Sequence, residues 1–318
     1  MEERSGHSRF ARFAWFVLGY NILVILWGVF LRASKSGDGC GQHWLTCQGE
    51  VIPSAPQLKT IIEFSHRITS SLAGVFLIAL LVWAVATWYR NRTEVTDRLV
   101  KMAGASLLFV MIEGILGAGL VLTGNTAENL TPERPFWMAA HLVNTLILLA
   151  FLTMTAWIAS GGRRLDLRIP STHLAVLAGG FVLILAVGIS GSIAALSSMI
   201  FPSATLAEGL AKDFSPTSNV LLRLRLVHPI LSITVGVFLV FSTGWLKAKS
   251  GNNHAVARWS GILSLLVLAQ VIFGAATLLM LAPIVMQLGH LFLADAIWIS
   301  FILFSLSFLE SGSEIQIA

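Results

Sequence analysis

Eight separate runs of apolar residues divide the chain, and this feature limits the possible fold more than any other. A helix needs about 20 largely apolar residues to cross the hydrocarbon core of a membrane. Because lipid offers the backbone no hydrogen-bond partners, runs of this length predict helices. We therefore predict an all-α polytopic membrane protein with eight transmembrane helices, over residues 13–31, 64–88, 99–122, 137–159, 174–196, 227–246, 259–281 and 284–309.

The composition supports this prediction. Of the 318 residues, 56% are hydrophobic and only 12% are charged, with a mean hydropathy of +0.80. A soluble domain carries about 25% charged residues. A disordered chain, a secreted disulfide scaffold and a nucleic-acid-binding protein are excluded, and the net charge of +5 matters less than where each charge lies.

The positions of Lys and Arg predict the orientation in the membrane. Thirteen of the 21 fall in segments 1–12, 90–101, 163–168 and 247–258, on one side of the predicted helices. The positive-inside rule places these segments and both termini in the cytoplasm. The first run, which starts after Arg12, lacks an Ala-x-Ala cleavage site and is interpreted as a retained helix rather than a signal peptide. We expect a multi-pass protein of the bacterial cell (inner) membrane.

Two parts of the sequence resemble each other. Residues 112–118 align with residues 269–275, and this alignment pairs Gly117 with Gly274. A weaker match relates the surroundings of Gly28 to those of Gly191. Small residues of this kind let helices pack closely.

The match predicts a parallel repeat of two pseudo-symmetric four-helix bundles, because an even number of helices returns the chain to the same side. The predicted domains are residues 1–162 and 163–318. Pro229 predicts either the start of a helix or a kink in it.

Four histidines lie near the outer ends of the even-numbered predicted helices. They are His66, His141, His228 and His290. One alternative is that each is a single polar residue hydrogen-bonded near the interface. Neutral imidazole is, however, a common metal ligand, and two facing helices that each supply one histidine give an axial pair for a haem iron. We therefore pair His66 with His141 and His228 with His290. A metal site without porphyrin would require clustered carboxylates or thiolates.

Arginines at the outer helix ends fit carboxylate groups of haem. An Arg side chain can bind a carboxylate with two parallel hydrogen bonds. The alternative is that these side chains extend to outer lipid headgroups. The expected propionate contacts are Arg32, Arg67, Arg223 and Arg225.

Glu63 distinguishes the first histidine pair from the second. It lies three residues before His66, on the same helix face, whereas Arg225 occupies the matching place before His228. A carboxylate there can accept a proton or stabilise developing positive charge. The alternative role is a salt bridge to Arg67. For Glu113, within the third run, we expect a hydrogen bond across the bundle.

The two cysteines both lie in the first outer loop. Cys40 and Cys47 are separated by six residues on the predicted oxidising side of the membrane. This arrangement favours a disulfide, structural or redox-sensitive, over free thiols.

Several of these residues together resemble the haem A synthase family. Residues 36–47, with a Cys pair around Trp44, resemble its first outer loop. The sequence Glu63-Phe64-Ser65-His66-Arg67 resembles its second-helix motif, and the segments around His141 and His290 resemble its later histidine segments. The resemblance extends over nearly the whole chain.

This resemblance implies an oxidoreductase that acts on a CH3 group. The family oxidises the C8 methyl group of haem O to the formyl group of haem A for haem-copper oxidases. By resemblance, His66 and His141 hold the substrate haem, His228 and His290 hold a resident haem b, and Glu63 is the catalytic carboxylate. The implied partners are haem O, membrane lipid, and possible contacts with a haem O synthase, an electron donor or a second copy of the chain.

Two other functions remain open from the sequence. One is a dihaem b-type membrane electron carrier linked to quinol. The other is a haem-binding or haem-transport protein without turnover.

Overall fold

The computed structural model describes residues 2–129 and 131–310, with side chains from residue 9 onward. The side chain of Arg4, one of the basic residues used for orientation, lies outside this part. The described residues form helices and no named strand, which confirms the all-α prediction. The helices are α1 (Glu2–Ala33), α2 (Leu58–Arg90), α3 (Glu94–Leu122), α4 (Arg134–Ala159), α5 (Ser171–Ile200), α6 (Leu206–Phe214), α7 (Val220–Arg225), α8 (Val227–Lys249), α9 (His254–Leu279) and α10 (Ile284–Glu310).

Eight of these helices are long and apolar enough to cross a membrane, as predicted. The predicted and observed ends differ by up to six residues, except that α1 begins eleven residues before the predicted start at residue 13. The closest junction, between α9 and α10, is a short turn in which Leu281 and Ala282 adopt positive φ values of 62° and 54°. Pro229 lies in the first turn of α8, where a missing N–H costs no intrahelical hydrogen bond, and α8 begins two residues before it.

The two short helices α6 and α7 were not predicted. Both lie between α5 and α8 and begin at side-chain caps. Thr205 accepts a hydrogen bond from the Glu208 N–H, and Asn219 accepts one from the Leu221 N–H. Helices this short lack the run of about 20 apolar residues from which a membrane span is predicted.

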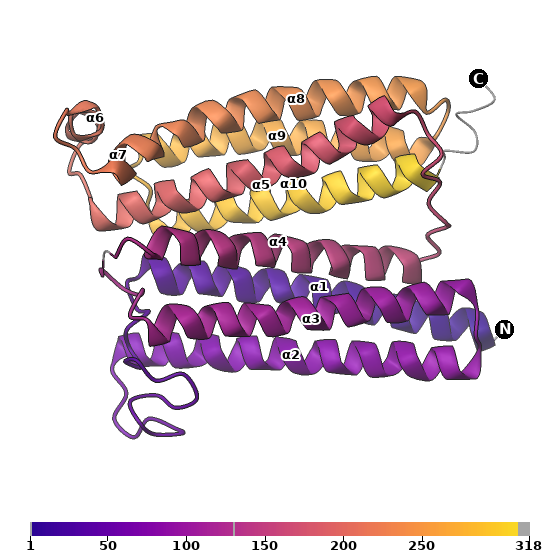
Figure 1. Ribbon diagram of the computed structural model, residues 1–318, viewed down its shortest axis with the longest axis horizontal. Helices are drawn as coiled ribbons and strands as arrows, with labels where there is room; N and C mark the ends of the chain where they lie inside the picture. Colours follow the sequence, from indigo (N-terminus) through magenta and orange to yellow (C-terminus); the bar gives the residue numbers. More distant parts are fainter. Residues whose placement is uncertain (1, 130, 311–318) are drawn as a thin grey trace.

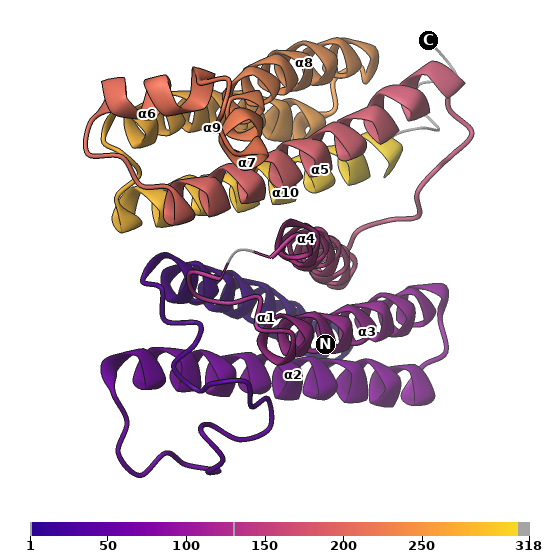
Figure 2. The same cartoon turned by 60° about the vertical axis from the view of Figure 1, so that its left-hand side comes forward.

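The membrane helices form two groups of four. Figure 1 shows α1–α4 in one group and α5, α8, α9 and α10 in the other. The groups adjoin at α4 and α10. Figure 2 shows the same arrangement from another side. The linker after α4 joins the groups at the end of the bundle where α1 begins, and the loop before α2 and helix α6 lie at the opposite end. The repeat itself stays a prediction.

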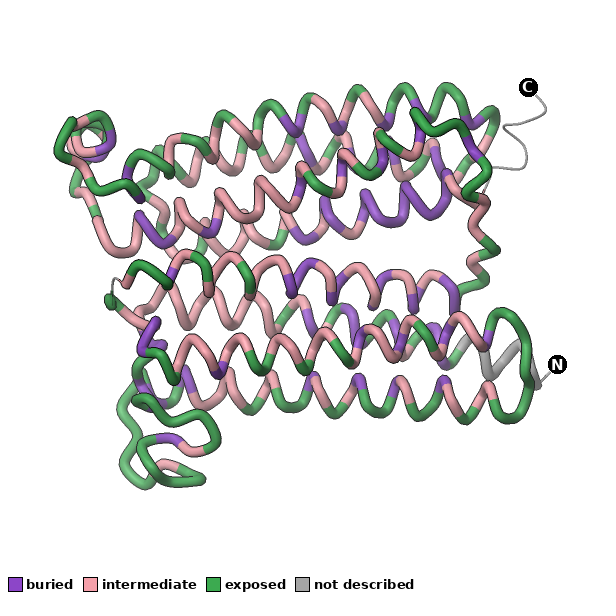
Figure 3. Tube along the Cα trace, in the orientation of Figure 1, coloured by how far each residue is buried: buried purple, intermediate pink, exposed green. Residues whose placement is uncertain are grey.

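Helices α4 and α10 form the centre of the protein. In their most apolar windows 61% and 67% of residues are buried, against 11–22% in the other six spans. Figure 3 shows this burial along both helices. The Trp298 Nε1–H of α10 donates a hydrogen bond of 2.7 Å to the Leu146 carbonyl of α4. The outer helices instead expose apolar side chains, which suits a lipid environment.

Aromatic rings pack against one another between α5 and α10. Phe181 meets Trp298 and Phe301 edge to face, with ring centroids 5.5 Å and 4.9 Å apart. Gly180 leaves room for this packing, since a Cβ there would lie 2.3 Å from the Phe301 Cζ. The nearest atom to a Cβ on the neighbouring Gly179 would be 4.0 Å away.

These adjacent glycines give a matched test of the packing. We expect Gly180→Ala to destabilise the protein by about 1–3 kcal/mol, because the buried Phe301 ring must move. Gly179→Ala should leave stability unchanged or slightly higher, because alanine is the better helix former. Thermal unfolding in detergent measures both. Equal midpoints for the two variants would contradict the described packing.

Candidate functional site

The four predicted histidines lie toward the same end of the bundle, the end that carries the loop before α2. His66 is on α2, His141 on α4, His228 on α8 and His290 on α10. Each lies within the first nine residues of its helix, and all four are half-buried. The fold thus brings together four polar rings that are far apart in the sequence.

Each imidazole ring lies against a glycine on the preceding long helix. In every case the ring carbon between the two nitrogens, Cε1, is the atom that a Cβ on the glycine would approach most closely. Three of the four glycines leave no room for that Cβ. The distances are 3.0 Å for Gly28 and His66, 3.9 Å for Gly117 and His141, 2.9 Å for Gly191 and His228, and 2.9 Å for Gly274 and His290.

This contact sharpens the prediction for the small residues. Gly117 and Gly274 were expected to let helices approach. The structure shows that they accommodate histidine rings, and Gly28 and Gly191 do the same. The weak sequence match around Gly28 and Gly191 therefore corresponds to a shared contact, in which a glycine lies against a histidine ring.

His228 and His290 face each other closely. Their ring centroids are 6.2 Å apart and their planes are nearly perpendicular, at 88°. Two imidazoles on opposite sides of one metal have centroids roughly 6 Å apart, because a metal–nitrogen bond is about 2 Å and the nitrogen lies about 1 Å from the centroid. The observed spacing fits a shared axial metal.

The hydrogen bonds of these rings leave ligand atoms free. The Nδ1 atom of His228 lies 3.1 Å from the Ser190 hydroxyl, an outer partner of the kind that orients a metal-bound histidine. Within the described residues the Nδ1 atoms of His66, His141 and His290 are buried without a hydrogen-bond partner. Buried polar atoms normally have partners, so these rings fit a group that the protein itself does not supply.

Helices α3 and α9 each place a polar side chain on one ring of a pair. The Glu113 carboxylate lies 3.5 Å from the Nε2 of His141, and the Gln270 amide lies 3.4 Å from the Nε2 of His290. Glu113 also accepts hydrogen bonds from Asn144 and Thr145, which confirms the predicted bond across the bundle. Its nearness to His141 was missed, although the alignment of residue 113 with residue 270 contained that signal.

Glu63 is buried and held from two sides. It is 3% exposed. Its Oε1 forms a salt bridge of 2.5 Å with Arg67, and its Oε2 accepts a hydrogen bond of 2.8 Å from the Cys40 backbone N–H. The salt bridge considered from the sequence is therefore present, and the loop contact comes in addition to it.

Cys40 and Cys47 form the predicted disulfide. Both are buried, and the loop between them rests on the first turns of α2. Arg67 donates hydrogen bonds to the carbonyl groups of Trp44 and Thr46 at 3.0 Å and 2.9 Å. Gly39 allows the close contact, because a Cβ there would lie 2.4 Å from the Lys59 carbonyl.

The arginines expected to bind propionates have protein partners. Besides Arg67, Arg225 forms a salt bridge of 2.6 Å with Asp213, and Arg223 donates to the Pro216 carbonyl. Arg32 lies 3.5 Å from the Gln287 side chain. The propionate role of all four stays a prediction.

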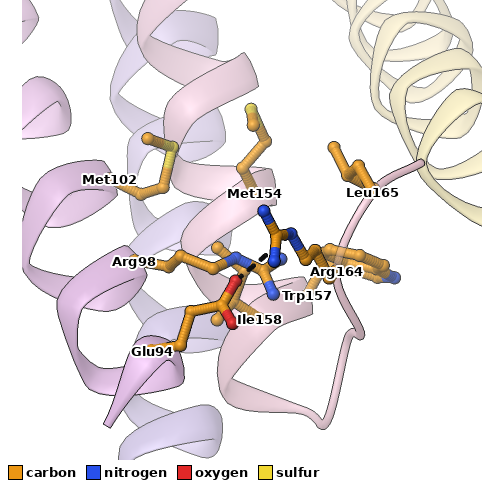
Figure 4. Close-up of a pocket in the computed structure, with 8 residues that line it drawn as sticks. All are labelled: Glu94, Arg98, Met102, Met154, Trp157, Ile158, Arg164 and Leu165. Atoms are coloured by element: carbon orange, nitrogen blue, oxygen red, sulfur yellow. Dashed lines mark ion pairs between the residues drawn. The ribbon is translucent and has the colours of Figure 1, made fainter. Parts of the chain in front are cut away.

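A separate cavity of about 240 Å³ lies at the other end of α3 and α4. Figure 4 shows its lining, where Glu94 pairs with Arg164 at 3.5 Å and Arg98 lies over the Trp157 ring. Met154, on its wall, is thirteen residues along α4 from His141, which is about 20 Å at 1.5 Å per residue. This cavity is distinct from the histidine site.

Comparison with known proteins identifies a family that matches most of the chain. A family model described as cytochrome oxidase assembly protein matches residues 11–302. A Thermus thermophilus protein named Protoheme IX farnesyltransferase is 41% identical over 96% of this chain and 50% of its own length. A Heme A synthase of Symbiobacterium thermophilum is 28% identical over 87% of this chain and 88% of its own length. A Heme A synthase of Halalkalibacterium halodurans is 38% identical over 41% of this chain and 42% of its own length.

The chain spans about half the length of the Thermus proteins that it matches. The Symbiobacterium protein, in contrast, is matched over most of its length.

The contact between the disulfide loop and α2 can be tested independently of function. We expect Gly39→Ala to lift the loop, because the new Cβ would collide with backbone. The buried Cys40–Cys47 bond should then react with a water-soluble thiol about tenfold faster or more. Gly37→Ala, where the nearest contact would be an ordinary 3.4 Å, is the control. Reduction at one rate in both variants would refute the contact.

Proposed function

Because the chain belongs to the COX15-CtaA family of cytochrome oxidase assembly proteins, we propose that it is a haem A synthase. The proposed reaction is stepwise oxidation of the C8 methyl group of haem O to the formyl group of haem A. The observation that carries this proposal is the pair of histidine sites at one end of the bundle, with the carboxylates of Glu63 and Glu113 beside the first site. The first site, with Glu63 and Glu113, is then the reaction site.

Four histidines hold the haem groups in this proposal. His66 and His141 bind the substrate haem, and His228 and His290 bind a resident haem b. Haem, when bound, supplies redox chemistry that no side chain can provide. The 6.2 Å ring spacing, the unpartnered Nδ1 atoms and the glycine seats support this assignment.

The protein's own groups position the substrate and manage charge. Glu63 is fixed by Arg67 and by the Cys40 N–H, yet each of its oxygens keeps a second lone pair. It would accept a proton or stabilise positive charge that develops on the ring substituent. Arg32, Arg67, Arg223 and Arg225 would contact propionates.

The farnesyltransferase name of the Thermus relatives is a weaker guide. Moving a prenyl group from a diphosphate requires carboxylates that hold Mg²⁺. Within the described residues no three or more His, Cys, Asp or Glu side chains gather into a metal-binding group. The Heme A synthase of Symbiobacterium is matched over 87% of this chain and 88% of its own length, so its name is the better guide to function.

The proposed setting follows from the charges. The protein lies in a bacterial cell membrane with both termini in the cytoplasm and the histidine sites near the outer face. Its proposed partners are haem O, lipid, a haem O synthase, an electron donor and a second copy of the chain.

Glu63→Gln tests the reaction. The amide keeps the size of the side chain but loses its negative charge. In cells that also make haem O, we expect haem A yield to fall on the order of a hundredfold while haem b stays bound. Extracted haems are identified by mass spectrometry. Glu133→Gln, at an exposed acid before α4, is the control.

The same experiment separates the other functions. An unchanged haem A yield in Glu63→Gln would remove its catalytic role. A wild-type protein that yields only haem b would be an electron carrier. One that releases haem O unchanged would be a binding or transport protein.

Gly274→Ala tests the resident haem site. Its Cβ would lie 2.9 Å from the His290 ring and displace it. We expect haem b per protein to fall at least about twofold, as measured by the pyridine haemochrome spectrum. Gly261→Ala on the same helix, where a Cβ meets open space, should keep the full haem content. Equal haem content in both variants would contradict the proposed ligand.

A further inference from the structure

The two histidine sites differ in charge at one position, where α3 and α9 each approach the second histidine of a pair. Glu113 of α3 lies there in the first site, with its Oε1 3.5 Å from the Nε2 of His141. Gln270 of α9 lies there in the second site, with its amide nitrogen 3.4 Å from the Nε2 of His290. The two residues also align in the similar sequence segments, so a carboxylate and an amide of similar size occupy equivalent places.

The first site supplies hydrogen-bond donors for this carboxylate. Asn144 and Thr145 follow His141 by three and four residues, which places them on the same side of α4. The Asn144 amide donates to the Oε2 of Glu113, and it also donates to the Phe109 carbonyl at 2.9 Å. The Thr145 hydroxyl donates to the Oε1 of Glu113. Both donor residues are buried. An ionised carboxylate acts only as an acceptor, and both oxygens of Glu113 accept here.

The second site lacks these donors. The residues three and four positions after His290 are Leu293 and Ala294, whose side chains cannot donate a hydrogen bond. The Oε1 of Gln270 is buried without a partner in the described residues. A carboxylate at position 270 would lack the hydrogen bonds that Glu113 receives, and burial of such a group is costly. The negative charge and its two donors therefore occur together in one site, and both are absent from the other.

The charge of Glu113 is not neutralised by a Lys or Arg side chain. Glu63, the other carboxylate of the first site, forms a salt bridge with Arg67. Within the part of the chain that the structure describes, Glu113 instead pairs with the imidazole of His141, and no ion pair joins it to a Lys or Arg. Its charge therefore acts on the His141 ring and on a group bound to that ring, and the low dielectric of a protein interior strengthens the effect.

We propose that Glu113 is a positioning residue that acts through His141 and lowers the reduction potential of the haem bound there. This inference rests on the proposed function, which places the substrate haem at His66 and His141. Ferric haem carries one more positive charge than ferrous haem, so a negative charge beside an axial ligand stabilises the ferric form. The same charge favours positive charge that develops on the substrate ring. The haem of the second site, beside the neutral Gln270, lacks this effect.

Redox titration of the purified protein tests this proposal. The full chain is made in cells that also make haem O, haemin is added to fill any site that is still empty, and reduction is followed by visible spectroscopy. In Glu113→Gln, which keeps the size of the side chain, we expect the equilibrium constant for reduction of one haem to rise about tenfold, or ~59 mV for one electron. Glu113→Asp keeps the charge and should stay closer to wild type than Glu113→Gln does.

A reciprocal variant moves the charge to the second site. Gln270→Glu, combined with Leu293→Asn and Ala294→Thr to supply the two donors, should lower the reduction constant of the other haem about tenfold. Glu133→Gln, at an exposed acid before α4, should shift neither haem. The variants at positions 113 and 270 must therefore shift different haems in opposite directions. A shift of the same haem by both variants, or of neither haem, would overturn the proposal.

Haem content and thermal unfolding separate an electrostatic effect from damage to the structure. A purely structural role for Glu113 predicts a lower unfolding midpoint or lost haem in Glu113→Gln, with no change in the potential of the haem that remains. That result would overturn the proposal. If Glu113→Gln keeps no haem at all, the reciprocal variant decides, because the charge placed beside His290 must still lower the potential of its haem.

The yield of haem A distinguishes failure of this inference from failure of the proposed function. Wild type that makes no haem A, in a series that shows the expected shifts, would refute the proposed reaction and leave the role of Glu113 standing. Wild type that makes haem A, with potentials that do not respond to residue 113, would overturn the inference and leave the reaction standing.

Discussion

A polar side chain within the hydrocarbon layer must find its partner inside the protein, and the placement of functional groups in this chain follows from that requirement. The backbone meets the requirement by forming helices. Glu63 meets it through Arg67 and the Cys40 N–H, and Glu113 through Asn144 and Thr145. The histidine rings meet it only in part. The Nδ1 atoms of His66, His141 and His290 are buried without a hydrogen-bond partner in the described residues.

The two histidine sites have the same arrangement of glycines and polar residues around the rings, but they differ in charge. In both, glycines seat the rings and a polar residue of the third long helix approaches the second histidine. That residue is Glu113 in one site and Gln270 in the other. A carboxylate and an amide have nearly the same shape, so the frame is kept while the electrostatics change. Glu63 adds to the difference, because Arg225 stands at the matching place and pairs with Asp213.

Much of this organisation was predictable, because helix length, charge bias and histidine depth are written in short stretches of sequence. The eight spans, the disulfide and the four histidines toward one end needed no long-range information. The contact between Trp298 and Leu146 did, since residues 152 positions apart meet there only after α4 and α10 pack. Helices α6 and α7 were missed because their side-chain caps, not apolar runs, define them. The sequence contains the glycine that each histidine ring contacts, but it does not show which residue packs against that glycine.

The hydrogen bond from the Cys40 backbone N–H makes the position of the Glu63 carboxylate depend on the disulfide loop. Before the first outer loop closes, one oxygen of this buried carboxylate lacks its backbone donor. The loop is closed by a disulfide, and disulfides form where the surroundings are oxidising. In the proposed orientation, the backbone contact of Glu63 therefore depends on an oxidation step outside the membrane. Protein with the disulfide formed would hold Glu63 through both of its contacts. Newly inserted protein with the same fold would lack the hydrogen bond from the Cys40 N–H.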